Sequence, residues 1–383
     1  MRVNLIHIIV AALIITMVGC SHIRIHEPLQ SHADDWRTYG GSINRTNISP
    51  VVVTPPLDSV WEYAADAGFG HAPALVGDSF VFVANLRGEM FVLKSGTGAS
   101  VGRYDFKEAI VGTPVLEGDT LFIPIASNGE GIVAYDLIKG GIVWETAIGD
   151  VESAPLLIGE RLFAATVAGR LFCLDKKTGA IIWMYTVSAD RMPVAIQSSL
   201  ASDGKIIVFG CVDGKLYAVS ADNGRLIWSI QTNGCITASP TIFGGKVSVG
   251  SVDGSFYAVD VVTGKLIWKT VLSGKIFSSA VDRSGVYVGT SAKVIYCLDD
   301  KNGTIVWKTL LGGPIHSAPL VSGTTIYVGC MDKMLYALDR VTGKVIWSYQ
   351  TAGRLSSSPV IAGNHLVVFK DDRTIIAFRE TSK

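Results

Sequence analysis

Hydrophobic and polar residues alternate along this chain in short runs that return about every 40 residues. One such unit, Ala238–Trp268, reads ASPTIFGGKVSVGSVDGSFYAVDVVTGKLIW. Its runs of Val, Ile, Phe and Tyr are separated by turn signals, namely Gly244-Gly245, Asp253-Gly254 and Thr263-Gly264. Asp and Gly tolerate the positive φ angles that tight hairpins require. The pattern therefore predicts four short antiparallel strands in each unit.

A tryptophan occupies the start of the fourth strand in seven units, and a glycine takes the place of one tryptophan. The eight positions are Trp61, Gly102, Trp144, Trp183, Trp228, Trp268, Trp307 and Trp347. A four-stranded unit of this size cannot cover both faces of its sheet, so neighbouring units must stack on it. This spacing predicts the blades of a β-propeller. We interpret the tryptophans as apolar anchors between adjacent blades.

The number of opening strands sets the number of blades at eight. Opening strands are expected near Ala72, Thr113, Ala154, Ser198, Ser239, Ser279, Ala318 and Ser358. The last unit has no tryptophan strand, and Trp61 has no opening strands before it. We therefore predict that Val60–Tyr63 forms the outer strand of the last blade, which would close the ring and protect its sheet edges. The predicted fold class is all-β, an eight-bladed propeller of four-stranded antiparallel blades over residues 56–383, closed by an N-terminal strand.

Residues 1–19 have the features of a secretory signal peptide. The apolar run Leu5–Val18 is short for a membrane span and follows the positive charge of Arg2. Met17-Val18-Gly19-Cys20 resembles a bacterial lipobox, which implies lipidation of Cys20. Because Ser21 follows the cysteine, the resemblance implies anchoring in the outer membrane, on its periplasmic face.

Residues 20–55 are expected to be a lipid-anchored tether followed by a rim segment. The polar stretch Ser21–Asp35 predicts a solvated tether, and Trp36, which lies outside the repeat period, is expected to pack on the propeller rim. Three histidines in the tether do not have a common zinc-site spacing. Without the signal peptide the chain carries 32 basic and 33 acidic residues, and it has no basic patch that would favour nucleic acid.

The cysteines after Cys20 are expected to be free thiols, packed as small buried core residues. Cys173 and Cys297 occupy the same repeat position, and so do Cys211 and Cys330. Each pair is three blades apart, far beyond the 4.4–6.8 Å Cα separation of a disulfide. A count of free thiols should therefore give five, including Cys235.

The repeat in Ala258–Trp268, A-x-D-x-x-T-G-K-x-x-W, resembles that of the pyrroloquinoline-quinone (PQQ) type propellers. The resemblance makes a quinone-dependent dehydrogenase a serious alternative, and such an enzyme needs a calcium site at the propeller centre. The residue three before each opening-strand proline should lie near that centre; these are Gly70, Val111, Glu152, Gln197, Thr237, Phe277, His316 and Ser356. Glu152 is the only carboxylate among them, whereas calcium takes six to eight oxygen ligands. His71 and His316 have no evident nucleophile beside them, so we expect no metal, no cofactor and no catalytic site.

The lipobox, the short tether and the eight repeats together resemble the BamB family of outer-membrane assembly lipoproteins. The resemblance implies a non-catalytic scaffold that binds proteins of the β-barrel assembly machinery, as a monomer within a complex. The interval after Trp183 is longer than the others, and its extra segment, Ser188–Gln197, is where we place a partner-binding loop with Asp190, Arg191 and Met192. Exposed Arg and Met are favoured at interfaces. The alternatives are a PQQ-type enzyme or relic and an envelope protein with an unrelated partner.

Overall fold

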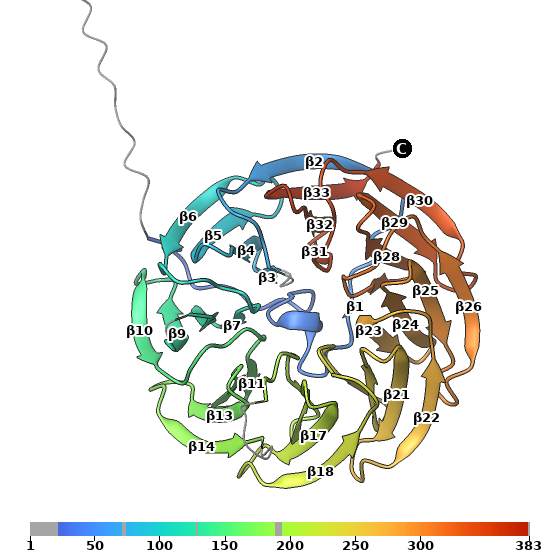
Figure 1. Cartoon of the computed structure of the whole chain (residues 1–383). Coiled ribbons are helices and arrows are strands. Elements are labelled where there is room, and N and C mark those ends of the chain that lie inside the picture. The colour runs from blue at the N-terminus through green and yellow to red at the C-terminus, as the bar shows by residue number, and fades with distance from the viewer. Residues whose placement is uncertain (1–21, 71–73, 128, 188–193, 382–383) are drawn as a thin grey trace, which may run out of the picture.

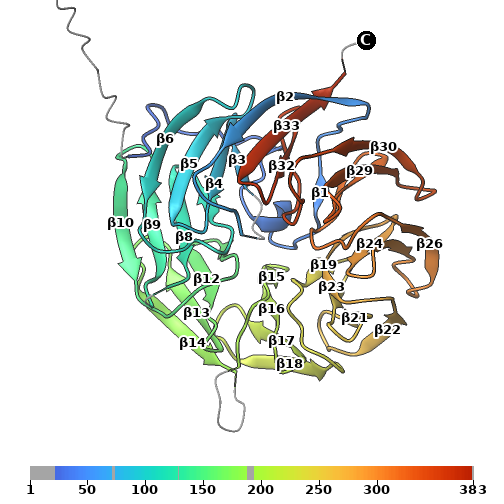
Figure 2. The same cartoon turned by 45° about the horizontal axis from the view of Figure 1, so that its top comes forward.

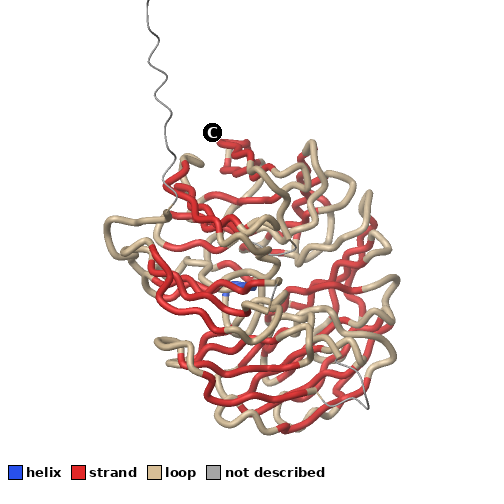
Figure 3. The backbone as a smooth tube through the Cα atoms, turned by 60° about the vertical axis from the view of Figure 1, so that its left-hand side comes forward, coloured by secondary structure: helices blue, strands red, loops and turns tan. Residues whose placement is uncertain are grey.

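The computed structural model is a ring of eight small sheets around a central channel (Figure 1). It describes residues 22–70, 74–127, 129–187 and 194–381. Within these ranges the only helical segment is the single 3-10 turn η1 (Tyr39–Gly41), and strands account for the remaining regular structure (Figure 3). None of the described residues form a helix with the length and apolar character needed to cross a bilayer. The predicted fold class, an eight-bladed β-propeller, is confirmed.

Each blade contains four antiparallel strands that follow one another from the channel to the outer edge. Blades 1 to 4 consist of β3 (Leu75–Gly77), β4 (Phe80–Ala84), β5 (Glu89–Lys94) and β6 (Ser100–Asp105); β7 (Val115–Glu117), β8 (Thr120–Ile125), β9 (Gly131–Asp136) and β10 (Gly141–Thr146); β11 (Leu156–Ile158), β12 (Arg161–Ala165), β13 (Arg170–Asp175) and β14 (Ile181–Thr186); β15 (Ala201–Ser202), β16 (Ile206–Gly210), β17 (Lys215–Ser220) and β18 (Leu226–Gln231). Blades 5 to 8 consist of β19 (Thr241–Phe243), β20 (Lys246–Gly250), β21 (Ser255–Asp260) and β22 (Leu266–Val271); β23 (Ile276–Asp282), β24 (Gly285–Thr290), β25 (Val294–Leu298) and β26 (Ile305–Leu310); β27 (Leu320–Ser322), β28 (Thr325–Gly329), β29 (Met334–Asp339) and β30 (Val345–Gln350); β31 (Val360–Ala362), β32 (His365–Phe369), β33 (Thr374–Glu380) and β2 (Leu57–Ala64).

The ring closes as the sequence predicts. Strand β2 pairs antiparallel with β33, with Trp61 opposite Ala377, so the N-terminal strand completes the last blade (Figure 1). Blade 7 carries an additional inner strand that the repeat pattern does not predict. This strand, β1 (Ile48–Ser49), runs parallel to β27.

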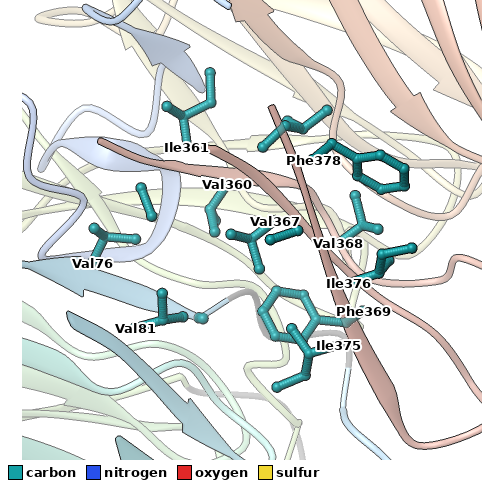
Figure 4. Packing of buried hydrophobic residues seen from close by; sticks show 14 of the residues in the cluster. Val76, Val81, Val360, Ile361, Val367, Val368, Phe369, Ile375, Ile376 and Phe378 are labelled. Atoms are coloured by element: carbon teal, nitrogen blue, oxygen red, sulfur yellow. The ribbon is translucent and has the colours of Figure 1, made fainter. Parts of the chain in front are cut away.

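The hydrophobic core lies between blades rather than in one central mass. Seven clusters of buried side chains separate neighbouring sheets. Figure 4 shows part of the cluster that joins blades 8 and 1, where Val367 and Phe369 of blade 8 approach Val81 of blade 1. Each sheet face is therefore covered by the next blade, as the repeat architecture requires.

The segment before β2 closes one end of the channel. We call residues 22–53 the N-terminal strap; it starts at the outer edge between blades 1 and 2 and runs inward to η1 at the channel (Figures 1 and 2). In six blades the innermost strand donates one backbone N–H, always from the equivalent residue, to a strap carbonyl at 2.8–3.0 Å. The donors are Val76, Leu116, Ser202, Ile242, Val281 and Val321. Unpaired inner edges are satisfied in this way.

The strap corrects the expected solvated tether. Ile23 is 0% exposed, and Ile25 and Leu29 are also buried, because these alternate residues face the groove between blades 1 and 2. Trp36 is buried as well, and its backbone pairs with Val76 on the innermost strand of blade 1. The polar composition of Ser21–Asp35 concealed this alternation, because only every second residue of the short run 23–25 is apolar.

Candidate functional site: the central channel and the open face

The channel encloses a cavity of about 420 Å³. Six of the eight residues that were expected at the centre line it; they are Val111, Glu152, Gln197, Thr237, Phe277 and His316. The rings of Phe277 and His316 pack together with centroids 4.6 Å apart. Tyr39, from η1 of the strap, lines the cavity from the closed end. These six positions therefore lie at the channel, as the repeat register predicts.

A buried arginine holds the strap at the closed end. Arg45 is 1% exposed, and its guanidinium donates to Leu200 O at 2.8 Å, to Pro155 O at 3.0 Å and to Thr38 Oγ1 at 2.6 Å. It also donates to the carbonyl of Tyr39. Burial lowers the pKa of Arg45 to about 9, and Tyr39 opposes that shift. The carbonyl and hydroxyl oxygens that accept these hydrogen bonds offset the cost of burying the Arg45 cation, although none of them belongs to a carboxylate.

Three serine hydroxyls at the channel wall join neighbouring blades. Ser199 Oγ accepts the N–H of Ala154 at 3.1 Å, and Ser239 Oγ accepts the N–H of Ser199 at 3.1 Å. Ser358 Oγ accepts the N–H of Ala318 at 2.8 Å in the same way. These bonds run around the channel from blade to blade. Ser199, Ser239 and Ser358 therefore have a structural use, whereas Ser153 Oγ is buried without a hydrogen-bond partner among the described residues.

The channel residues do not fit a quinone held by calcium. Among the described residues that line the wall, Glu152 is the one carboxylate; the other polar groups are hydroxyls, an amide and a histidine. Calcium prefers several carboxylate and carbonyl oxygens. Over the described ranges no group of three or more His, Cys, Asp or Glu side chains could hold a metal ion. We therefore derive no chemistry through a quinone at this site.

The tryptophans lie on the outer strands and contact the next blade. Trp268 Nε1 donates to Asp300 O at 3.0 Å, and a Cβ added at Gly303 would lie 2.4 Å from the Trp268 ring. Gly303 has a φ of +73°, so the turn needs glycine both for its backbone and for the space. The same contact joins Trp61 to Gly98, Trp144 to Gly179, Trp183 to Gly224, Trp228 to Gly264 and Trp307 to Gly343. Trp347 packs edge-on against Phe378.

The channel opens on the face that carries the loops between blades and the turns between the second and third strands. We call it the open face. The predicted turn at Asp253-Gly254 lies there, and Tyr257 donates to Asp253 Oδ2 at 2.8 Å. The equivalent Tyr336 donates to Asp332 Oδ2 at 2.6 Å, and burial together with this hydrogen bond raises the pKa of Tyr336 to about 12. These pairs fix the turns of the open face.

Both ends of the long loop after Trp183 are attached to blades 3 and 4. The N–H of Val187 donates to Gly169 O at 2.8 Å, and the N–H of Val212 donates to Ala195 O at 3.2 Å. Cys211 Sγ contacts Ala195 O at 3.2 Å. The proposed partner-binding residues Asp190, Arg191 and Met192 lie outside the described residues, as do Cys20 and His71.

Two family models together cover the propeller. Residues 187–382, just over half of the chain, match the model described as "Beta-alanine-activating enzyme, beta-propeller". Residues 56–191 match the model described as "Outer membrane protein assembly factor BamB". The chain belongs to the first of these propeller families and is BamB-like in its PQQ-type repeats.

Individual relatives of this BamB-like propeller fall into two classes. The outer membrane protein assembly factor BamB of Burkholderia pseudomallei is 26% identical over 193 residues, which cover 46% of this chain and 49% of that protein. A quinohemoprotein alcohol dehydrogenase of Pseudomonas putida, ADH-IIG, is 26% identical over 185 residues, covering 37% of this chain and 25% of that protein. The chain thus spans half or less of the length of these relatives.

A solved structure supports the fold of the BamB-like propeller. The crystal structure of BamB from Moraxella catarrhalis has a TM-score of 0.73 and 20% sequence identity, and the match covers 84% of this chain and 99% of that chain. At this identity the likeness concerns the fold alone.

The cysteines of the BamB-like propeller follow the prediction with one exception. Cys173, Cys211, Cys297 and Cys330 are buried free thiols, and burial raises the pKa of each. Cys235 is also free but is exposed, so its predicted burial is wrong. It lies in the connection between blades 4 and 5, where the chain crosses the open face before reaching Ile236.

Proposed function

We propose that this protein is a non-catalytic, BamB-like scaffold lipoprotein on the periplasmic face of the outer membrane. Lipidated Cys20 anchors it, and the open face binds proteins of the β-barrel assembly machinery. The BamB match over residues 56–191 is the observation that carries the assignment. The non-catalytic part is supported by the channel wall, where Ser199, Ser239 and Ser358 join neighbouring blades and Glu152 is the single carboxylate among the described lining residues.

The open face is a suitable binding surface because the described ends of its long loop are attached to the blades. The long loop after Trp183 leaves blade 3 at Val187 and rejoins the fold at Val194 and Ala195, and backbone bonds attach both ends. An anchored loop loses less conformational entropy on binding than a free one does. We therefore keep Asp190, Arg191 and Met192 as the proposed contact residues.

Crosslinking in membranes tests the assignment. The full-length protein is crosslinked in its own envelope, captured, and its partners are identified by mass spectrometry. We expect components of the barrel-assembly machinery. Replacing Asp190, Arg191 and Met192 together by alanine should reduce this capture severalfold.

A variant on the opposite face serves as the matched control. Val262→Ala with Lys301→Ala changes two exposed residues in turns between third and fourth strands, and these turns lie away from the open face. Capture by this variant should equal that of the wild type. Recovery of envelope proteins that have no role in barrel assembly would refute the BamB-like assignment.

The second candidate is a quinone-binding propeller, either an enzyme or a relic. The match to the quinohemoprotein alcohol dehydrogenase favours it. Mixing the purified protein with the quinone and calcium distinguishes the two candidates. Stoichiometric quinone binding with dye-linked alcohol oxidation would replace the scaffold assignment.

A further inference from the structure

The strap fills the one blade interface that lacks a tryptophan. A Cβ added at Gly102 would lie 2.8 Å from the carbonyl oxygen of His22 and 3.3 Å from Ile23 Cα. At this position glycine is required because backbone, rather than an indole ring, covers the outer strand. Figure 1 shows the strap entering between β6 and β10.

Hydrogen bonds hold this part of the strap against blade 2. The N–H of Ile23 donates to Tyr135 Oη at 3.2 Å, and the Tyr135 hydroxyl donates back to Ile23 O at 3.0 Å. The N–H of Ile25 donates to Leu137 O at 2.8 Å, and that of Leu29 to Asp119 Oδ1 at 2.6 Å. With Ile23 fully buried, the fold holds the chain three residues after Cys20.

We propose that the outer edge of blades 1 and 2 is a membrane-facing surface that rests on phospholipid. This inference depends on the lipidation of Cys20 in the proposed function. Three residues span at most about 11 Å, so the acyl anchor must lie within that distance of Ile23. A free tether from Cys20 to Leu57 would reach roughly 120 Å and leave the propeller able to take any orientation. The docked strap therefore shortens the possible distance between the acyl anchor and the propeller about tenfold.

The side chains on this edge suit a lipid surface. Arg24 and Lys139 are exposed cations beside the strap, and Arg24 Nε donates to Ile138 O at 3.1 Å. Strand β10 of the same edge carries the exposed aliphatic side chains Ile142 and Val143, a pair that also recurs on the outer strands of blades 3 to 7. Cations interact with anionic headgroups, and the aliphatic groups can enter the interface. Lys139 also pairs with Asp136, which moderates its charge.

Two equivalent residues on opposite sides of the ring provide a matched test. Val143 on blade 2 and Val306 on blade 6 both lie one residue before the tryptophan of their strand, and they are 51% and 58% exposed. The full-length acylated protein, with Cys235→Ser, carries Val143→Cys or Val306→Cys labelled with a fluorophore. Each form is reconstituted in phospholipid vesicles that contain nitroxide-labelled headgroups.

We expect the label at position 143 to be quenched severalfold more than the label at 306. Equal quenching in vesicle-bound protein would overturn the membrane-facing edge but leave lipidation intact. Failure to bind vesicles would overturn both the membrane-facing edge and the lipid anchor. The scaffold role is tested separately, by crosslinking capture of partner proteins. Ile23→Asp with Ile25→Asp should free the strap and abolish the difference between labels while the acyl anchor retains the protein. Proteolysis shows whether the strap is released in this variant. If the two labels still differ in quenching after release, the docked strap does not orient the propeller on the membrane.

Discussion

Two kinds of blade interface occur in this propeller, and they differ in what fills the outer groove. Between blades 5 and 6, Trp268 packs on Gly303, a residue of the next repeat. Between blades 1 and 2, the strap at Ile23 covers Gly102 and bonds to Tyr135, more than a hundred residues along the chain. An indole supplied by the repeat and a backbone segment from the N-terminus thus fill equivalent spaces.

The difference has consequences for what each interface connects. The tryptophan contact is complete within two adjacent repeats, so it can be copied around a ring. The strap contact is non-local and also ties the chain near Cys20 to the fold. In the first kind of interface, packing joins two adjacent repeats; in the second, it also fixes where the N-terminal strap leaves the propeller.

The largest expected effect comes from emptying a tryptophan interface. Trp268→Ala removes a buried indole and its hydrogen bond to Asp300 O, and we expect a loss of about 3–5 kcal/mol in unfolding free energy. Urea denaturation followed by circular dichroism measures it. Val262→Ala, at a residue that is exposed in the adjacent turn, should change stability by less than about 0.5 kcal/mol. A loss below about 1 kcal/mol for Trp268→Ala would show that the anchors matter little.

A somewhat smaller loss is expected at the strap interface. Ile23→Ala shortens a fully buried side chain, which costs about 2–3 kcal/mol because the strap can partly settle into the space. Val52→Ala, at an exposed residue of the same strap, is the control and should be nearly neutral. If Ile23→Ala were also neutral in urea denaturation, the strap would not be equivalent to a tryptophan anchor.

The repeat interfaces could be predicted from sequence, and the strap interface could not. The tryptophan period, the turn at Asp253-Gly254 and the pairing of Val60–Tyr63 with the last blade follow from local patterns that recur. The sequence shows that Gly102 replaces a tryptophan of the repeat, but the repeat does not indicate which distant segment packs there instead. The alternation Ile23-Arg24-Ile25 is the one sequence pattern that indicates a docked segment here, but it is only three residues long and is flanked by His22 and His26.

The channel was likewise partly predictable. The position three residues before the opening proline correctly placed Glu152 and Phe277 at the wall, because the same register holds in six of the eight blades. The closure of one end by Tyr39 and Arg45 was not predicted, since these residues lie outside the repeats. An arginine in a polar segment such as Arg45 is expected at the surface, yet its guanidinium is buried among backbone carbonyls.

A more selective change separates hydrogen bonding from burial at the strap. Tyr135→Phe keeps the ring but removes both bonds to Ile23, which should cost about 1–2 kcal/mol in urea denaturation. Tyr63→Phe changes a tyrosine that lies partly exposed on β2, and it should cost less than about 0.5 kcal/mol. Equal effects of the two substitutions would mean that burial of Ile23, rather than its hydrogen bonds, holds the strap.

The smallest effect concerns the turns that carry the glycines beneath the tryptophans. Asp260 lies in the turn that holds Gly264 against Trp228. Its carboxylate accepts hydrogen bonds from the hydroxyl and from the backbone N–H of Thr263. Both bonds lower the pKa of Asp260, and the bond from the hydroxyl has the larger effect. A carboxyl whose folded pKa lies below its unfolded value, about 3.9, stabilises the fold above that pH and loses this effect as pH falls through the folded pKa. The difference in thermal midpoint between the wild type and Asp260→Asn should therefore shrink between pH 6 and pH 3. In blade 1 the equivalent residue is Lys94, so Lys94→Ala should show no such change with pH. A constant difference for Asp260→Asn would mean that this turn, and with it the tryptophan interface, depends on side-chain shape and not on the carboxylate charge.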